Sequence, residues 1–165
     1  MDIEIQPVPL EDKSILQNLM ELYQHDFSEY DGADVDEHGC FGYLYLDHYW
    51  TEHGRYPFLI RFQGHLAGFV LVRRISPPDA DPMHSIAEFF IMRKYRRRGI
   101  GRIVAHQVFD MFPGTWSVAQ EEENLPAQRF WRSIIAEYTN GDYSEVTLPP
   151  DEWKGPVQRF KSRCE

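Results

Sequence analysis

The segment from Ile86 to Phe112 constrains the fold of this chain more than any other part of the sequence. It opens with an apolar run, Ile86–Met92, which is long enough for a buried strand and carries one charged residue, Glu88. A basic stretch with glycines follows, and apolar residues then recur at helical spacing, at Ile100, Ile103, Val104, Val108, Met111 and Phe112. The segment therefore predicts a strand, a glycine-containing turn and an amphipathic helix over 98–112.

The turn of this segment has the features of an anion-binding site. Gly99 and Gly101 let a phosphate group approach the backbone closely, because neither has a side chain. The first N–H groups of the following helix have no partner within the helix, and the helix dipole favours negative charge there. Further positive charge comes from Arg96, Arg97, Arg98 and Arg102. We therefore expect the turn to hold a pyrophosphate.

Three other interpretations of the turn are weaker. A P-loop carries Lys and then Ser or Thr after its last glycine, whereas Gly101 is followed by Arg102 and Ile103. A dinucleotide-binding turn has a third glycine where this chain has Val104. A nucleic-acid-binding patch would explain the arginines, but neither the glycines nor the change from strand to helix.

The remaining elements follow from periodicity and turn residues. A first strand is predicted at 3–8, then helices at 11–23 and 43–53 with a long acidic and aromatic loop between them. Gln63-Gly64 separates two strands as a tight hairpin. The other predictions are strands at 57–62, 65–73, 115–119, 145–148 and 157–161, and a helix at 124–137 capped by Asn124.

Composition predicts one domain over 1–165. Hydrophobic residues make up 42% of the 165 residues, which favours a packed core over disorder. No apolar stretch approaches the roughly 18 residues that a membrane span requires, so no membrane association is expected. Cys40 and Cys164 are expected to be free thiols, and the N-terminal sequence lacks the pattern of a signal peptide. These features predict a cytoplasmic protein.

The net charge of −9 is unevenly distributed. Residues 1–56 hold 13 acidic and 2 basic residues, whereas 57–165 hold 13 acidic and 15 basic residues. An acidic first third favours a cationic partner, and the basic turn favours an anionic one. Nucleic acid is not an expected partner, because so acidic a chain offers few phosphate contacts outside that turn.

Two motifs together resemble those of the GNAT superfamily of acetyl-CoA-dependent N-acetyltransferases. Arg96-x-x-Gly99-x-Gly101, after an apolar strand and Tyr95, is similar to the acetyl-CoA pyrophosphate loop of that superfamily. Asn124-x-x-Ala127-x-x-Phe130-Trp131 resembles its second conserved element. The resemblance implies an α/β (α+β) fold with a mixed, mostly antiparallel central sheet of six to seven strands. It also implies about four flanking helices and a splay between the fourth and fifth strands.

The resemblance also implies where acetyl-CoA, used as cosubstrate, would bind. The pantetheine arm would lie in the splay, bonded to the backbone near Phe90, Ile91 and Met92. Asn124 would approach the pantetheine and Phe130 would pack beside it, although core packing explains Phe130 equally well. The pyrophosphate would be held by Arg96, Arg97, Arg98, Gly99, Ile100, Gly101 and Arg102.

Acetyl transfer to an amine needs a base, because an alkylammonium has a pKa of about 10.4. Glu88 is the candidate, since an isolated carboxylate in an apolar strand is costly unless it serves a function; the alternative is a solvent-facing residue on a half-exposed strand. Many relatives have a tyrosine as leaving-group acid where this chain has Trp131, whose indole cannot serve. The gap between Val118 and Asn124 is about two residues longer than is common in the family.

The acceptor pocket in this architecture is built by the first two helices and their loop. The expected acceptor-binding residues are Asp26, Tyr30, Tyr49 and Trp50. Acids and aromatics together favour a primary amine of a small cationic molecule or peptide, while the alternative is core aromatics and a solvated acidic face. No metal is expected, and a homodimer is possible by analogy. The main alternative to an enzyme is a non-catalytic acyl-CoA-binding or sensory module.

Overall fold

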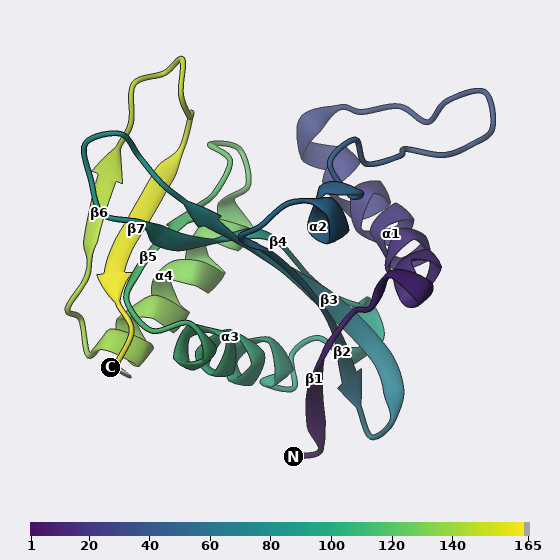
Figure 1. The fold of residues 1–165 in the computed structure, drawn as a ribbon, viewed down its shortest axis with the longest axis horizontal. Coiled ribbons are helices and arrows are strands. Elements are labelled where there is room, and N and C mark those ends of the chain that lie inside the picture. Colours follow the sequence, from purple (N-terminus) through teal and green to yellow (C-terminus); the bar gives the residue numbers. More distant parts are fainter. Residues whose placement is uncertain (164–165) are drawn as a thin grey trace.

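The computed structural model describes residues 1–163 of the chain, and its strands form one seven-stranded sheet (Figure 1). The strand order is β1-β2-β3-β4-β5-β7-β6, and every neighbouring pair is antiparallel except the parallel pair β4–β5. The strands are β1 Ile3–Pro7, β2 Arg55–Phe62, β3 His65–Ile75, β4 Met83–Ile91, β5 Thr115–Ala119, β6 Ser144–Thr147 and β7 Pro156–Lys161. This confirms the predicted mixed, mostly antiparallel sheet.

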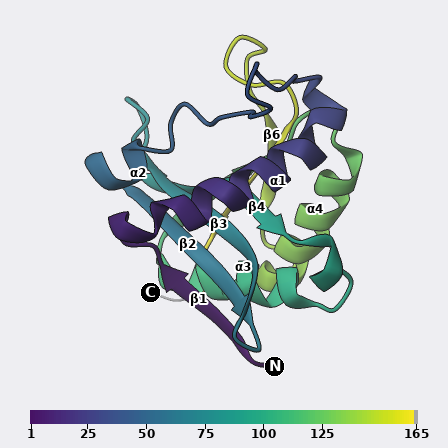
Figure 2. The same ribbon diagram turned by 90° about the vertical axis from the view of Figure 1, so that its right-hand side faces the viewer.

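Helices cover both faces of the sheet (Figures 1 and 2). The α-helices are α1 Lys13–Asp31, α2 His48–Thr51, α3 Ile100–Met111 and α4 Leu125–Thr139. α1 and α2 lie on one face, and α3 and α4 lie on the other. Two 3-10 turns, Leu10–Asp12 and Arg93–Tyr95, precede α1 and the basic turn.

Two apolar cores result from this layering, and β3 shows how the sequence produces them. Phe69 and Leu71 pack in the core under α1, whereas Val70 and Val72 pack in the core under α3 and α4. Side chains of a strand alternate between the two faces. Because both faces are covered, β3 is apolar at consecutive positions instead of alternating with polar residues.

Two of the predicted helices have different lengths in the structure. α1 continues to Asp31, past the predicted end at Tyr23, and ends at Gly32, which adopts a left-handed φ of 70° and donates its N–H to Ser28 O. The segment over 26–31 was expected to be loop, and that expectation is wrong. A longer helix was predicted over 43–53, but the structure has only the single turn of α2, His48–Thr51, in this segment. The Gln63-Gly64 hairpin is confirmed, with φ of 50° and 80° as a type I′ turn requires.

β4 contains a bulge and then separates from β5, and these two irregularities create the site. In the pairing with β3, Leu71 is opposite Glu88 and Val72 is opposite Ile86, which leaves Ala87 as the extra residue. β4 pairs with β5 only at His84 and Ser85. Beyond Ser85 the two strands diverge, which confirms the splay expected between the fourth and fifth strands.

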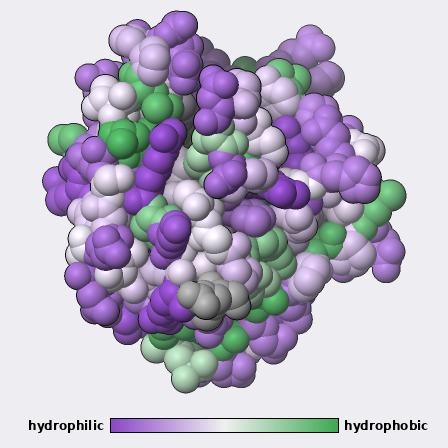
Figure 3. Space-filling model, turned by 60° about the vertical axis from the view of Figure 1, so that its left-hand side comes forward, coloured by the Kyte–Doolittle hydropathy of each residue, from purple (hydrophilic) through white to green (hydrophobic). Residues whose placement is uncertain are grey.

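The surface seen from the side of β6 and β7 is largely hydrophilic, with apolar residues in small groups (Figure 3). Within residues 1–163, no helix combines the length and apolar character needed to cross a bilayer. Cys40 is exposed and unpaired, while Cys164 lies outside the described residues.

Candidate active site

Glu88 lies on the α1 side of the sheet, where two tyrosine hydroxyls bind its carboxylate. The bulge at Ala87 turns Glu88 to this face, although Ile86, two residues earlier, packs in the core on the other face. Tyr23 from α1 donates to Glu88 Oε2 at 2.5 Å, and Tyr43 from the loop after α1 donates to Oε1 at 3.2 Å.

Burial raises the pKa of Glu88 to about 7, and it outweighs the two tyrosine hydrogen bonds, which lower it. A carboxyl group with a pKa near 7 is divided between its two forms at neutral pH. It can therefore accept a proton as a carboxylate and release it again as an acid.

Two cavities meet beside Glu88. The first, of about 690 Å³, extends from α1 and α4 to the basic turn. The second, of about 560 Å³, lies over Glu88 between α1, the loop after it and the end of β5. The residues that line both are Tyr23, Phe27, Phe89, Asn124, Ala127 and Trp131. Two chambers with a shared wall suit a reaction between two substrates.

The far end of the first cavity has the backbone geometry that suits an anion. Arg97 and Gly99 both adopt left-handed conformations, with φ of 61° and 78°, so the turn folds back on itself before α3 begins. No side chain caps α3, which leaves its first N–H groups available to a ligand. Gly101 is required for a different reason, since a Cβ there would lie 3.1 Å from Phe130 Cζ.

The splay leaves one edge of β4 open next to this anion site. Met92 N–H donates to Ala67 O of β3 at 2.8 Å. Backbone N–H and C=O groups alternate in direction along a strand. The backbone groups of Phe90 therefore also face β3, whereas those of Phe89 and Ile91 face the splay. Ile91 O accepts a hydrogen bond from Arg96 Nε at 2.7 Å. The backbone groups left open to a ligand are therefore the N–H and C=O of Phe89 and the N–H of Ile91. An extended ligand can bind there as an added strand does.

Comparison with known proteins identifies the family of this architecture. The model of the acetyltransferase (GNAT) family matches residues 16–134. The chain belongs to the GNAT family. A comparison with curated protein sequences finds no match.

Solved structures of acetyltransferases share the fold across almost the whole chain. An acetyltransferase from Thermus thermophilus has a TM-score of 0.71 at 14% identity, over 98% of this chain and 97% of that one. The PaiA N-acetyltransferase of Thermoplasma acidophilum, in complex with coenzyme A, has a TM-score of 0.65 at 11% identity, over 98% and 99%. Spermidine N-acetyltransferase of Vibrio cholerae, in complex with CoA and spermine, has a TM-score of 0.66 at 13% identity, over 97% and 95%.

Most of the residues predicted to bind the cosubstrate line the first cavity of this GNAT chain. They are Phe90, Ile91, Arg96, Arg97, Gly99, Gly101, Arg102, Asn124 and Phe130. Asn124 also caps α4 as predicted, accepting the N–H of Ala127 at 3.1 Å. Arg98 is exposed outside the cavity, Ile100 is buried in the core, and the N–H of Met92 is bonded to β3. Phe89, which the sequence pattern did not single out, has the open backbone groups instead.

The residues predicted to bind the acceptor separate into two groups, and none of them lines the cavity over Glu88. Asp26 and Tyr30 line the first cavity. Tyr49 is buried in the core beneath Arg55, and Trp50 donates its indole N–H to Val8 O at 2.8 Å. Tyr49 and Trp50 line neither cavity, so the structure gives them a packing role.

Asp26 connects α1 to the basic turn. Its carboxylate accepts bonds from Arg93 at 2.6 Å and from Arg96 at 2.8 Å. Partial burial opposes ionisation, but the two arginines lower the pKa of Asp26 below its usual value. Arg96 thus braces the turn from inside, between Asp26 and Ile91 O. Arg97 and Arg102 also line the cavity, and Arg102 donates to Glu137 Oε1 of α4 at 2.8 Å.

The second cavity has a different set of charged and aromatic residues. Carboxylates come from Asp31, Glu88 and Glu121, with Arg73 as the basic residue, and aromatic walls come from Tyr23, Phe27, Tyr43, Tyr45, Phe89, Trp131 and Trp153. Burial, and then the charges of Glu123 and Asp31, raise the pKa of Glu121. These residues come from seven separate segments, so no local pattern in the sequence could have grouped them.

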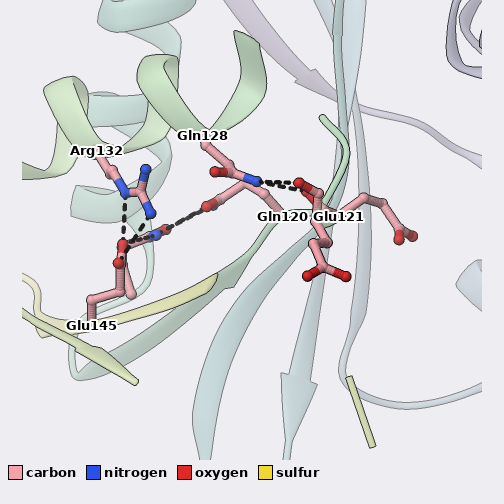
Figure 4. A network of polar contacts seen from close by, with 7 residues as sticks. Gln120, Glu121, Gln128, Arg132 and Glu145 are labelled. Carbon is pink, nitrogen blue, oxygen red and sulfur yellow. Dashed lines mark hydrogen bonds and ion pairs between the residues drawn. The ribbon is translucent and has the colours of Figure 1, made fainter. Parts of the chain in front are cut away.

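A network of amide side chains fixes the loop that carries Glu121 (Figure 4). Gln120 and Gln158 exchange two hydrogen bonds, at 2.7 and 2.9 Å, inside the protein. Gln128 of α4 donates to the carbonyls of Glu121 and Glu122, at 2.9 and 3.0 Å. Buried amides that satisfy each other hold a backbone in one conformation. The carboxylate of Glu121 is therefore presented from a fixed loop.

Within residues 1–163, no cluster of three or more His, Cys, Asp or Glu side chains is suited to hold a metal ion.

Trp131 is buried and lies edge-on to Phe89 and Phe130, with ring centroids 5.0 Å away in both cases. It forms part of the wall shared by the two cavities.

Proposed function

We propose that residues 1–165 form one acetyltransferase domain, which transfers an acetyl group from acetyl-CoA to a primary amine of a small cationic molecule or peptide. The observation that carries this proposal is the position of Glu88. Its carboxyl group, with a pKa of about 7, lies in the second cavity, which shares a wall with the first cavity and the basic turn at its far end.

The first cavity suits acetyl-CoA. The turn over 96–102 offers backbone N–H groups and the side chains of Arg97 and Arg102 to a pyrophosphate. The open backbone groups of Phe89 and Ile91 suit the amides of a pantetheine arm. The coenzyme A complexes of the Thermoplasma acidophilum and Vibrio cholerae proteins support this interpretation, since both share the fold. Acetyl-CoA supplies the activated thioester.

The second cavity suits the amine. Glu88 takes a proton from the nitrogen that attacks the thioester, and the shared wall at Phe89 brings the two substrates together. Because Glu88 accepts a proton only when ionised, the rate should rise with pH through about 7 and then level off.

The charges of the second cavity favour an acceptor with more than one positive charge. Glu88 acts on the reacting nitrogen, while Asp31 and Glu121 remain for a second cationic group. The aromatic walls add cation–π attraction. The spermine bound to the Vibrio cholerae enzyme supports the same acceptor chemistry.

Release of free thiol from acetyl-CoA tests the proposal directly. Wild-type protein should release thiol with a panel of monoamines, diamines and amino-terminal peptides, and most rapidly with a dication. Glu88→Gln should still bind acetyl-CoA in a calorimetric titration but lose at least about a hundredfold in turnover. Glu11→Gln changes an exposed glutamate that lines neither cavity, and it is the matched control.

Two results would contradict the proposal in different ways. Tight acetyl-CoA binding without turnover of any amine would favour a non-catalytic acyl-CoA-binding or sensory protein. Stabilisation by NAD or ATP in preference to acetyl-CoA would mean that the turn holds another pyrophosphate.

A further inference from the structure

The reaction needs a proton for the sulfur that leaves, and the position that carries a tyrosine in many relatives is Trp131 in this chain. An indole N–H is far too weak an acid for this purpose. The residue that takes over must reach the first cavity, where the sulfur would lie, and must hold a transferable proton.

Tyr23 satisfies both conditions. It is one of two tyrosines that donate to Glu88, but it lines both cavities, whereas Tyr43 lines only the second. Its hydroxyl is bonded to the carboxylate that receives the proton of the amine, and the same side chain lines the chamber in which the thioester would be bound.

The position of the Tyr23 ring is set by packing. The ring contacts Phe69 and Phe90 edge-on, with centroids 5.5 and 5.6 Å away, and Phe27 at 5.7 Å. These contacts come from β3, β4 and the next turn of α1. The hydroxyl is consequently held in place by the core, and a phenylalanine at position 23 would keep the same contacts.

We propose that Tyr23 is the general acid of the transfer, and that it passes the proton taken up by Glu88 to the leaving sulfur. This inference rests on the proposed function. In relatives with a tyrosine at the position of Trp131, the helix that corresponds to α4 supplies the acid. In this chain α1 supplies it instead.

The proton balance closes without any further reactant. A neutral amine forms the C–N bond, and the nitrogen then gives one proton to the Glu88 carboxylate. As the C–S bond breaks, the sulfur keeps the electron pair and takes the hydroxyl proton of Tyr23. Tyr23 in turn takes the proton held by Glu88. The products are an amide and a free thiol, and both side chains return to their starting forms.

The electrostatics of the pair favour this direction. Burial, and then the charge and hydrogen bond of Glu88, raise the pKa of Tyr23 well above its usual range, with smaller contributions from Tyr43 and Asp31. Tyr23 therefore keeps its proton while Glu88 is ionised. Once Glu88 is protonated, the proton moves overall from a carboxyl group with a pKa of about 7 to a thiolate. Because the pKa of a thiol is about 8.5, this transfer is favourable in free energy.

The test compares two acetyl donors. Acetyl-CoA has a leaving thiolate that must be protonated, whereas 4-nitrothiophenyl acetate releases a stable thiolate that needs no acid. At about pH 8.5, Tyr23→Phe should lower kcat with acetyl-CoA by about 10² to 10³. With the aryl thioester the same variant should lose less than about tenfold.

Tyr43→Phe is the matched control, because it also removes one hydroxyl donor from Glu88. It should change the rates with the two donors by the same factor. Calorimetric binding of acetyl-CoA checks that each variant is folded. If Tyr23→Phe does not fold, 3-fluorotyrosine at position 23 retains the hydroxyl and should alter kcat with acetyl-CoA alone.

Equal losses with both donors for Tyr23→Phe would overturn the inference and leave Tyr23 as a residue that positions Glu88. An unchanged rate with acetyl-CoA would overturn it as well. Failure of the proposed function is recognised separately, since wild-type protein would then acetylate no amine with either donor, and the inference would fall with it.

Discussion

Replacing Glu88 by glutamine should stabilise the protein at alkaline pH and change its stability little at acid pH. The reason is that the folded protein holds this carboxyl in a place where its charge is unfavourable. In the unfolded chain the pKa of Glu88 returns to its ordinary value of 4.5, whereas in the folded chain it is about 7. Between these two values the folded protein retains a proton that the unfolded chain has released, so rising pH favours unfolding.

The magnitude follows from the difference between the two pKa values, which is about 2.5. At about 1.36 kcal/mol for each pKa unit, ionisation of Glu88 costs up to about 3 kcal/mol of folding free energy above pH 7. Glutamine keeps the shape of the side chain but carries no charge to bury. Its amide oxygen can accept one of the two tyrosine hydrogen bonds, and its NH2 can donate to the other hydroxyl.

Urea unfolding of wild-type protein and Glu88→Gln at half-unit steps from about pH 5 to 8.5 measures this effect. The free energy of unfolding of the variant, minus that of the wild type, should rise by about 2 to 3 kcal/mol across this range. Glu11→Gln controls for the loss of an exposed glutamate. A difference that stays constant with pH would refute the reasoning, because Glu88 would then ionise as an ordinary surface carboxyl does.

Three further substitutions test other parts of the site. Glu121→Gln should raise KM for a diamine about three- to tenfold more than KM for a monoamine, because it removes one ion pair worth about 1 kcal/mol of binding. Glu123→Gln, on the same loop but exposed, is the control. Equal changes of KM for both acceptors would contradict the assignment. Asn124→Ala should lower the free energy of unfolding by about 1 kcal/mol through loss of the α4 cap, seen as a fall of about 2 to 4 °C in Tm. Gly101→Ala should weaken acetyl-CoA binding about tenfold by calorimetry, because a Cβ 3.1 Å from Phe130 Cζ pushes that ring into the cavity. Helix propensity alone would raise the free energy of unfolding of this variant by up to about 1 kcal/mol. An unchanged Kd would show that the ring moves elsewhere.

Several parts of the fold and of the first cavity could be predicted from the sequence, because their causes lie close together in the chain. The strand, turn and helix between Ile86 and Phe112 need only the apolar spacing and the two glycines. The Gln63-Gly64 turn and the Asn124 cap depend on the conformational and hydrogen-bonding preferences of single residues. Most of the predicted cosubstrate residues line one cavity because the turn itself forms its end.

Tertiary structure decided everything that depends on which distant segments meet. The bulge at Ala87 reverses the direction of the side chains that follow it, so alternation along β4 could not show which face carries Glu88. Tyr43 reaches Glu88 across 45 positions of sequence, and Asp31 and Glu121 join the same cavity from separate segments. Tyr49 and Trp50 have the composition of a binding site but are used to pack α2. Local structure follows from neighbours in the chain, whereas the pKa of Glu88 and the shape of the acceptor cavity follow from neighbours in space, which the fold alone assembles.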